Sequence, residues 1–371
     1  MAMQCSSFNY NLLCTDGDAR CGMFQTARGA VDTPVFMPVG TQATVKAMSP
    51  EVLLTLGAQV ILSNTYHLHM RPGEELIKDL GGLHKFMAWD RPILTDSGGY
   101  QAFSLAKLVK INDEGLLFAS HLDGSRHMLT PEKAIQIQED LGSDIMMCLD
   151  ECVAYPCSEH YVETSVKRTS LWAERCLAAR QSENALFGII QGGVYPEFRK
   201  RSASEITSLP FDGIAVGGLS VGEGHDIMMD VLDVTLPHIP FEKPRYLMGV
   251  GTPKDIVEAV SRGVDMFDCV LPTRNARNGM LFTKNGKITL KQARYKHNPS
   301  PPDENCSCYT CRNFSLAYLR HLYISREILG SVLNTIHNLH FYLELMSDIR
   351  HSIREKCFDS LRKQMKEMYN D

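Results

Sequence analysis

The sequence predicts an α/β fold: a (β/α)8 or TIM barrel that carries an inserted antiparallel hairpin and a small C-terminal zinc-binding subdomain. Two observations predict the barrel. Eight short apolar runs stop abruptly at polar or glycine residues, and helix-like stretches separate most of them. Near-continuous hydrophobicity is typical of strands covered on both faces. Eight such strands alternating with helices within about 250 residues favour a barrel over the competing doubly wound open sheet.

The apolar runs are the expected barrel strands, and each has the length of a strand rather than of a helix. They cover residues 33–40, 59–65, 92–99, 143–151, 185–193, 212–218, 245–251 and 264–271.

Helix-like stretches follow most of these runs, and we expect helices over residues 49–57, 130–142, 159–181 and 252–263. The last of them carries its own start signal, with Thr252 as N-cap, Pro253 at the first helical position and Asp255 in the first turn. Residues 103–130 interrupt the alternation after the third strand and predict the inserted antiparallel hairpin.

Three parts are therefore expected along the chain. Residues 1–271 form the barrel with an N-terminal lead-in and the hairpin insertion, residues 272–345 form a basic hairpin and the zinc-binding subdomain, and residues 346–371 form a C-terminal helix.

Composition places the chain among ordinary globular proteins, with 371 residues, 44% hydrophobic content and 22% charged content. Its N-terminus lacks the apolar core of a signal peptide, and apolar residues nowhere persist for the roughly 18 positions that a membrane span needs. We therefore expect a cytoplasmic protein with no membrane partner.

The ends of the predicted strands gather an unusual set of side chains, and active sites of such barrels lie where the strands end. Three carboxylates, two amides and adjacent glycine pairs leave room for a planar ligand against bare backbone. The residues at these ends are Asn64, Asp96, Asp150, Gln191, Gly218, Gly249 and Asp268.

A basic track follows the last strand, although the whole chain has a net charge of -5. After Asp268 the next acidic residue is Asp303. A carboxylate beside such a track is typical of a group that reacts next to a polyanion, of which nucleic acid is the commonest. The alternative is a solvated, lysine-rich hairpin. The basic residues between the two aspartates are Arg274, Arg277, Lys284, Lys287, Lys291, Arg294 and Lys296.

Cys306, Cys308 and Cys311 form a C-x-C-x2-C cluster, and His337 follows on an apparent helix, with His340 as an alternative fourth ligand. Three thiolates and one imidazole complete a closed tetrahedral shell, which predicts one structural Zn2+ per subunit. We expect the remaining cysteines outside the substrate pocket to be reduced and mostly structural: Cys5, Cys14, Cys21, Cys148, Cys157, Cys176, Cys269 and Cys357.

Seven motifs occur in one order along the chain: TDSGGYQ, CLDEC, GIIQGG, GGLSVGE, GVGTPKD, FDCVLPTRNARNG, and the C-x-C-x2-C cluster with its distant histidine. Together they resemble the queuine/preQ1 tRNA-ribosyltransferases, also called tRNA-guanine transglycosylases. The resemblance runs from about Gly22 to about Leu343.

The resemblance implies a base exchange at the anticodon wobble position 34 of G-U-N tRNAs, those for Asp, Asn, His and Tyr. Guanine leaves and a 7-deazaguanine enters. Asp268 corresponds to the nucleophile that forms a covalent bond with the ribose, and Asp96 corresponds to the group that handles the proton of the base. The resemblance also implies a homodimer in which the zinc subdomain supports the contact between the two subunits.

Guanine recognition also follows from residue chemistry. An ionised Asp150 offers two acceptors to the N1-H and 2-amino donors of guanine, while Gln191 and the backbone N-H of Gly218 can serve its O6. Tyr100 and Met248 resemble the family's pair that sandwiches the base, although Met248 in an apolar strand is often simply core. The full expected pocket is Ser97, Gly98, Gly99, Tyr100, Asp150, Cys152, Gln191, Gly218, Leu219, Val221 and Met248.

Cys152 and Val221 resemble the bacterial type, which takes preQ1 (7-aminomethyl-7-deazaguanine), and Glu223 is expected to favour the cationic aminomethyl group indirectly by orienting local backbone. The loop from Gly249 leads into the helix that begins at Thr252, and free amides at a helix N-terminus attract anions. The resemblance implies that this loop contacts RNA. The expected RNA contacts are Gly249, Val250, Gly251, Thr252, Pro253, Lys254, Asp255, Thr273, Arg274, Asn275, Ala276 and Arg277.

Two functions from other classes stay open at this point. One is a non-catalytic tRNA-binding subunit of the same fold, against which the presence of both Asp96 and Asp268 argues. The other is a metal-dependent barrel hydrolase, indicated by His67 and His69 as an H-x-H after the second strand.

Overall fold

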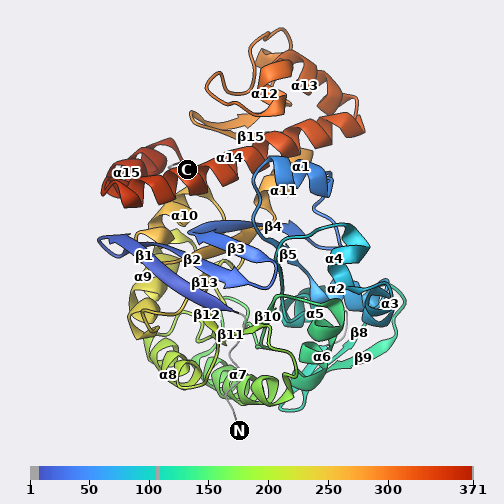
Figure 1. Cartoon of the computed structure of the whole chain (residues 1–371), viewed down its shortest axis with the longest axis vertical. Coiled ribbons are helices and arrows are strands. Elements are labelled where there is room, and N and C mark those ends of the chain that lie inside the picture. Colours follow the sequence, from blue (N-terminus) through green and yellow to red (C-terminus); the bar gives the residue numbers. More distant parts are fainter. Residues whose placement is uncertain (1–7, 106–108, 370–371) are drawn as a thin grey trace.

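The computed structural model describes residues 8–105 and 109–369, and its largest part is a closed barrel of eight parallel strands (Figure 1). Each strand lies inside one of the eight apolar runs, so the predicted barrel is confirmed. Most of these strand residues are buried because helices cover the outside and side chains fill the inside. In barrel order the strands are β4 (Val35–Gly40), β5 (Ile61–Ser63), β6 (Ile93–Thr95), β10 (Ile145–Met147), β11 (Ala185–Ile190), β12 (Gly213–Val216), β13 (Arg245–Leu247) and β14 (Met266–Cys269), which pairs with β4.

The four predicted helices are present as α1 (Pro50–Thr55), α6 (Pro131–Leu141), α7 (Glu159–Ala179) and α10 (Pro253–Val260). At the N-caps of α6 and α10, Thr130 Oγ1 accepts a hydrogen bond from Lys133 N (3.2 Å) and Thr252 Oγ1 accepts one from Asp255 N (3.1 Å). The helices between the strands are α1 (Pro50–Thr55), α2 (Thr65–Met70), α3 (Glu74–Asp79), α4 (Gly82–Met87), α5 (Gly99–Leu105), α6 (Pro131–Leu141), α7 (Glu159–Ala179), α8 (Pro196–Thr207), α9 (His225–Thr235) with the 3-10 turn η1 (Leu236–His238), and α10 (Pro253–Val260).

A three-stranded antiparallel sheet precedes the barrel, where the sequence predicted only a lead-in: β1 (Asn9–Asp16), β2 (Ala19–Thr26) and β3 (Gly29–Thr33). Its buried Arg20 forms a salt bridge with Asp265 (3.1 Å), just before β14. The Arg20 guanidinium also donates to Lys243 O (3.0 Å), just before β13. The sheet therefore contacts the barrel at the start of these strands, away from the end where the candidate active site lies.

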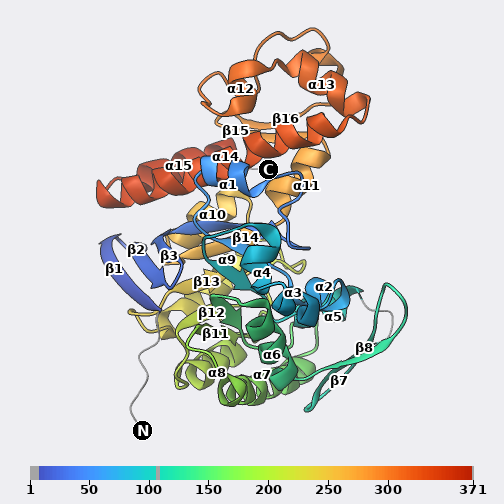
Figure 2. The same ribbon diagram turned by 45° about the vertical axis from the view of Figure 1, so that its right-hand side comes forward.

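The predicted antiparallel insertion after β6 is confirmed and has a third strand beyond the hairpin, and Figure 2 shows it extending from the side of the barrel. Its strands are β7 (Val109–Asn112), β8 (Gly115–Ala119) and β9 (Arg126–Leu129). The third strand leads directly into the Thr130 N-cap of α6.

After β14 the chain forms a separate subdomain joined to the barrel by one long helix, α14 (Figure 1). The elements are α11 (Leu271–Arg277), the antiparallel pair β15 (Met280–Thr283) and β16 (Gly286–Thr289), the 3-10 turn η2 (Ala293–Tyr295), α12 (Tyr309–Asn313), α13 (Leu316–Ile324), α14 (Ile328–Arg354) and α15 (Phe358–Met368). The division into three domains stays a prediction, and α14 runs without interruption across residue 345.

None of the helices in the described ranges combines the length and the apolar composition that crossing a membrane requires. The described cysteines outside the metal cluster are free thiols, as expected, and Cys5 lies outside the described residues.

Candidate active site and metal centre

The predicted strand-end residues come together at one end of the barrel. Asp96 follows β6, Asp150 follows β10, Gln191 follows β11, and Asp268 lies near the end of β14. Parallel strands present their carboxyl ends on the same side of a barrel, so side chains far apart in sequence converge there.

Two hydrogen-bond donors contact the same carboxylate oxygen of Asp268. Tyr246 Oη donates to Asp268 Oδ1 at 2.6 Å, and Gly249 N donates to the same atom at 2.8 Å. Burial raises the pKa of Asp268 above its ordinary value, while these two hydrogen bonds oppose the rise because they favour the ionised form. Tyr246 could not be singled out from the sequence, because it lies within one of the apolar runs that predict buried strands.

Asp96 lies beside Asp268 and is almost fully buried. Its Oδ1 accepts hydrogen bonds from Thr65 N (2.8 Å) and Gly98 N (3.2 Å), and its Oδ2 accepts one from the Asn64 side chain. Burial, with the charge of nearby Asp268 acting in the same direction and these hydrogen bonds opposing it, raises the pKa of Asp96 to about 6. A carboxyl with such a pKa can both give and take a proton near neutral pH.

Asp150 and Gln191 form a second buried pair, in which Gln191 Nε2 donates to Asp150 Oδ2 at 2.6 Å. Burial raises the pKa of Asp150 to about 6. The Gln191 Oε1 atom is buried and has no hydrogen-bond partner within the described residues. A Cβ atom on Gly217 or Gly218 would lie 2.7 Å or 2.3 Å from the Gln191 amide, so only glycine leaves room for this arrangement.

Arg199 of α8 lies behind this pair and was missed by the sequence analysis. Its fully buried guanidinium donates to the carbonyl oxygens of Ile190, Gly193, Gly217 and Gly218 at 2.8 to 3.3 Å. Burial lowers its pKa to about 10. The segment PEFRKR gives no hint of this role because it is typical of a solvated basic helix face.

The expected ring and thioether neighbours of the base are accessible. Tyr100, at the start of α5, is 48% exposed, and Met248 is partly exposed after β13. Met248 is therefore not simply a core residue. Ser97 and Leu219 are buried, whereas Val221 is partly exposed.

Cys152 and Glu223 lie near Asp150 and Arg199. Burial raises the pKa of Cys152 to about 12, with the charges of Asp150 and Glu223 acting in the same direction, so the side chain is a neutral thiol. Glu223 orients local backbone as expected: its carboxylate accepts hydrogen bonds from Ser220 N and, at 2.9 Å, from Val221 N.

The two segments expected to contact RNA flank Asp268. In the first, Gly249 is exposed and Thr252, Lys254 and Asp255 are partly exposed; in the second, Arg274 is exposed and Asn275 and Arg277 are partly exposed. The other expected contacts are buried: Val250, Gly251, Pro253, Thr273 and Ala276.

The four predicted metal ligands converge in the subdomain. The donor atoms of Cys306, Cys308, Cys311 and His337 all lie within 4.8 Å of one another. His337 Nδ1 faces the sulfur atoms at 3.2 to 3.8 Å, while its Nε2 lies 2.8 Å from the carbonyl oxygen of Phe282. That carbonyl fixes the tautomer in which Nδ1 is free to bind a metal, so the residues fit a metal ion. His340 is not part of this group.

No comparable ligand group occurs at the barrel mouth in the residues that the structure describes. His69 instead pairs with Glu74 through Nδ1 and Oε2 at 2.6 Å, on the side of the barrel. This pairing argues against the metal-dependent hydrolase.

The fold and the site together define a (β/α)8-barrel enzyme with buried carboxylates at its active-site end and a cysteine–histidine metal site in a separate subdomain. A family model described as queuine tRNA-ribosyltransferase matches residues 14–371. The chain belongs to this family, the tRNA-guanine transglycosylases, and is therefore a transferase.

Relatives with the name queuine tRNA-ribosyltransferase resemble the chain over nearly their whole length. The Desulforamulus reducens protein is 55% identical over 353 residues, covering 95% of each chain. The Listeria welshimeri protein is 56% identical over 368 residues, covering 98% of this chain and 97% of its own. The Thermoanaerobacter pseudethanolicus protein is 54% identical over 368 residues, covering 98% of each.

Proposed function

We propose that this enzyme exchanges guanine at wobble position 34 of G-U-N tRNAs for preQ1, a step in queuosine biosynthesis, with Asp268 as a covalent nucleophile. The observation that carries the proposal is the convergence of three carboxylates at the end of the barrel: Asp96 and Asp150 are buried, and Asp268 is partly exposed. Asp268 accepts two hydrogen bonds that favour its ionised form, and Asp96 beside it has a pKa of about 6.

In the first half of the reaction, Asp268 attacks the anomeric carbon of the ribose, and the bond from that carbon to guanine breaks. Guanine takes up a proton from Asp96 as it leaves. In the second half, preQ1 returns a proton to Asp96, attacks the same carbon and displaces Asp268. A carboxylate suits both halves because it attacks and leaves an oxocarbenium-like centre readily.

Base binding is assigned to the Asp150 and Gln191 pair. When ionised, Asp150 accepts the N1-H and 2-amino hydrogens of the base. Gln191 Nε2 already donates to Asp150 and has a second hydrogen that can serve O6, together with the backbone N-H of Gly218. Tyr100 and Met248 then cover the two faces of the ring.

Selection of preQ1 over the larger queuine is assigned to the wall formed by Cys152 and Val221. The aminomethyl group is assigned to the position beside the neutral thiol of Cys152 and the backbone turn held by Glu223. Competition between the two bases for labelled guanine exchange tests this choice, and equal inhibition by queuine would contradict it.

RNA binding is assigned to the two segments that flank Asp268. The amides at the start of α10 attract phosphate, and Arg274 and Arg277 at the end of α11 supply positive charge. The expected substrates are the tRNAs for Asp, Asn, His and Tyr, whose anticodons begin with G-U. A tRNA with another anticodon should not exchange guanine.

The cysteine–histidine site is proposed to hold one Zn2+ per subunit. Three thiolates and one imidazole provide the tetrahedral shell that zinc prefers, and a closed shell has a structural role. Zinc measured by mass spectrometry at one ion per chain, retained in Asp268→Asn, would match this assignment.

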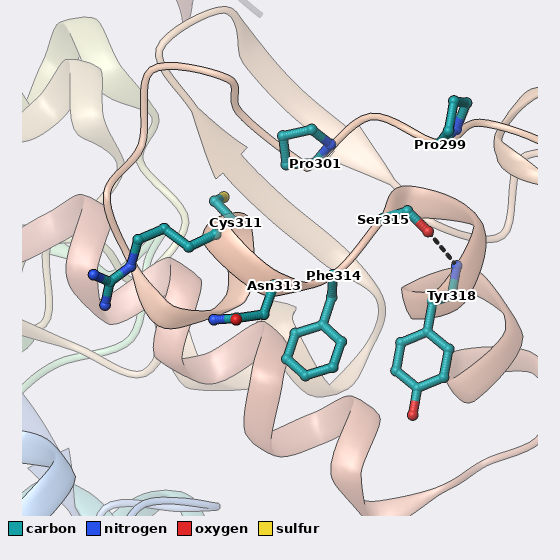
Figure 3. A pocket seen from close by; sticks show the side chains of 8 residues that line it. Pro299, Pro301, Cys311, Asn313, Phe314, Ser315 and Tyr318 are labelled. Carbon is teal, nitrogen blue, oxygen red and sulfur yellow. Dashed lines mark hydrogen bonds between the residues drawn. The ribbon is translucent and has the colours of Figure 1, made fainter.

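A homodimer in the cytoplasm is proposed as the working form, with the zinc subdomain supporting the contact. A pocket of about 520 Å³ lies on this subdomain, and the rings of Phe314 and Tyr318 that line it stack with their centroids 5.4 Å apart. Figure 3 shows the side chains around this pocket. Its other lining residues are Pro299, Pro301, Cys311, Arg312, Asn313 and Ser315. Tyr318→Ser should shift a dimer toward monomer in sedimentation, whereas a monomeric wild-type protein would contradict the proposal.

Labelled guanine and unmodified G-U-N tRNA test the central proposal. The wild-type protein should incorporate label and give a covalent species on a denaturing gel, Asp268→Ala should do neither, and Asp230→Ala on the exposed face of α9 should behave as wild type. A well-folded wild-type protein that binds tRNA without exchange would instead be the non-catalytic subunit.

A further inference from the structure

A single hydroxyl joins the long helix of the subdomain to the active-site end of the barrel. Tyr342 of α14 is fully buried, and its Oη donates to the carbonyl oxygen of Gly251 at 2.6 Å. Its ring lies 4.9 Å from the ring of Phe36 and 5.2 Å from that of Phe282, between centroids. The ring alone would fill this apolar site equally well as phenylalanine, so the hydroxyl is the distinctive feature.

The loop that receives this hydrogen bond is the one that touches Asp268. Gly249 N donates to Asp268 Oδ1 at 2.8 Å. Two residues further, Gly251 is packed so tightly against Cys269 that an added Cβ atom would lie 1.9 Å from the Cys269 sulfur. The short segment from Gly249 to Gly251 is thus held by Tyr342 on one side and by Asp268 and Cys269 on the other.

The same helix also holds the segment that follows Asp268. Asn338 Nδ2 donates to the carbonyl oxygens of Pro272 and Met280, each at 3.0 Å, and Asn334 Nδ2 donates to that of Ala276 at 3.1 Å. These acceptors lie on α11 and at the start of β15. Side chains of α14 therefore form hydrogen bonds with the backbone of both segments that flank Asp268, the Gly249–Gly251 loop and α11.

We propose that Tyr342 is a positioning residue for base exchange: its hydroxyl holds the Gly251 carbonyl so that the Gly249 N-H stays directed at Asp268. This inference rests on the proposed role of Asp268. Tyr342 itself does not contact Asp268, and it acts through the Gly249–Gly251 loop.

The expected consequence is a change in pH dependence as well as in rate. A donor on a carboxylate favours the ionised form and lowers its pKa. If the Gly249 N-H no longer donates to Asp268, that carboxyl should stay protonated to a higher pH. The acid limb of the plot of rate against pH should then shift to higher pH. Loss of packing alone would lower the amount of folded enzyme without moving that limb.

Tyr342→Phe tests the inference, and Tyr369→Phe is a matched control. Tyr369 is also buried, packs near Phe282 and donates to a backbone carbonyl, Thr283 O, at 2.6 Å, but that carbonyl lies in β15 away from Asp268. Guanine exchange with saturating tRNA would be measured across pH for each variant, together with zinc content and melting temperature.

Tyr342→Phe should lower kcat by about twofold to tenfold, the range expected for one hydrogen bond, with an upward shift of the acid limb and an unchanged KM for guanine. Tyr369→Phe should retain the wild-type kcat and acid limb. An unshifted limb in Tyr342→Phe, or an equal shift in Tyr369→Phe, would overturn the inference.

Gly251→Ala provides a second test if Tyr342→Phe does not fold. It displaces the same loop from the side of Cys269, so it should also move the acid limb upward, and an unmoved limb would count against the inference. A wild-type protein that does not exchange guanine would overturn the proposed function and this inference together. An active wild-type protein and a Tyr342→Phe variant with the same kcat and acid limb would overturn the inference alone.

Discussion

Two of the buried carboxylates at the active-site end work against the stability of the fold. Burial raises the pKa of both Asp96 and Asp150 from 3.8 to about 6. A carboxyl with a raised folded-state pKa stabilises the protein fully below pH 3.8, and that contribution is lost as the pH rises through about 6. At neutral pH both carboxylates are therefore mostly ionised in the folded protein, although burial favours their protonated form. Such perturbed pKa values are common at functional sites, where stability is lower than it could be.

Asp150→Asn should consequently make the folded protein more stable at pH 7.5. The shift from 3.8 to about 6 corresponds to roughly 2 to 3 kcal/mol of unfolding free energy, and the gain should shrink as the pH falls toward 5. Urea unfolding at the two pH values measures this difference. The variant should also lose guanine binding, because an amide cannot accept both donor hydrogens of the base. A variant less stable than wild type at pH 7.5 would contradict the argument.

Arg199 is the residue on which the glycine-rich walls of the base pocket depend. Arg199→Lys keeps the buried charge but replaces a fork of donors that reaches four carbonyl oxygens. We expect the chain to fold and the affinity for guanine, measured by calorimetry, to fall by about tenfold, the effect of one or two lost hydrogen bonds. Lys200→Ala, on the exposed face of the same helix, is the control. Equal guanine affinity in Arg199→Lys and wild type would show that the fork is dispensable.

At the scale of elements, local pattern predicted the barrel strands, the capped helices and the antiparallel insertion, but not the N-terminal sheet or the third strand of the insertion. The apolar runs are informative because both faces of each strand are buried. Strand β1 is an edge strand with alternating exposure, and β2 contains Arg20, whose partner Asp265 is far away in sequence. A buried arginine of this kind looks like a surface residue until its partner is known. Strand β9 is mostly exposed, so its apolar signal was too weak to reveal a third strand.

The end of α11 carries the charge that we expect to meet the RNA backbone. The Arg277 guanidinium donates to Thr273 O at 2.9 Å, so it is held along the helix rather than extended at random. Arg277→Ala should weaken tRNA binding and reduce the slope of log affinity against log salt by about 1, because one fewer counterion is released. Filter binding between low and moderate salt measures the slope, with Lys363→Ala on the exposed α15 as control. An unchanged slope in Arg277→Ala would remove this residue from the interface.

At the scale of the whole molecule, two hydrophobic cores share one helix. Leu333, near the start of α14, packs with the small subdomain core around Leu281 and Leu319. From Ile336 to Ile353 the same helix packs with the barrel core. The three cysteine ligands could be predicted because their spacing is local, whereas the distant His337 was predicted with His340 as an alternative. The sequence could not predict that the helix carrying His337 also reaches Gly251, because that contact joins residues 91 positions apart.

This arrangement predicts that metal removal loosens the subdomain without unfolding the barrel. The segment from residue 299 to residue 311 has little core of its own, so its order should depend on the metal shell. After chelation, or in Cys308→Ser, amide hydrogen exchange should rise sharply over residues 284–326 and stay low in the barrel strands and in residues 336–353. Guanine binding to the barrel should persist, because α14 still holds α11 and the Gly249–Gly251 loop. Amide hydrogen exchange that rises equally in β4, β11 and β14 would instead show that the barrel and the subdomain unfold as one cooperative unit.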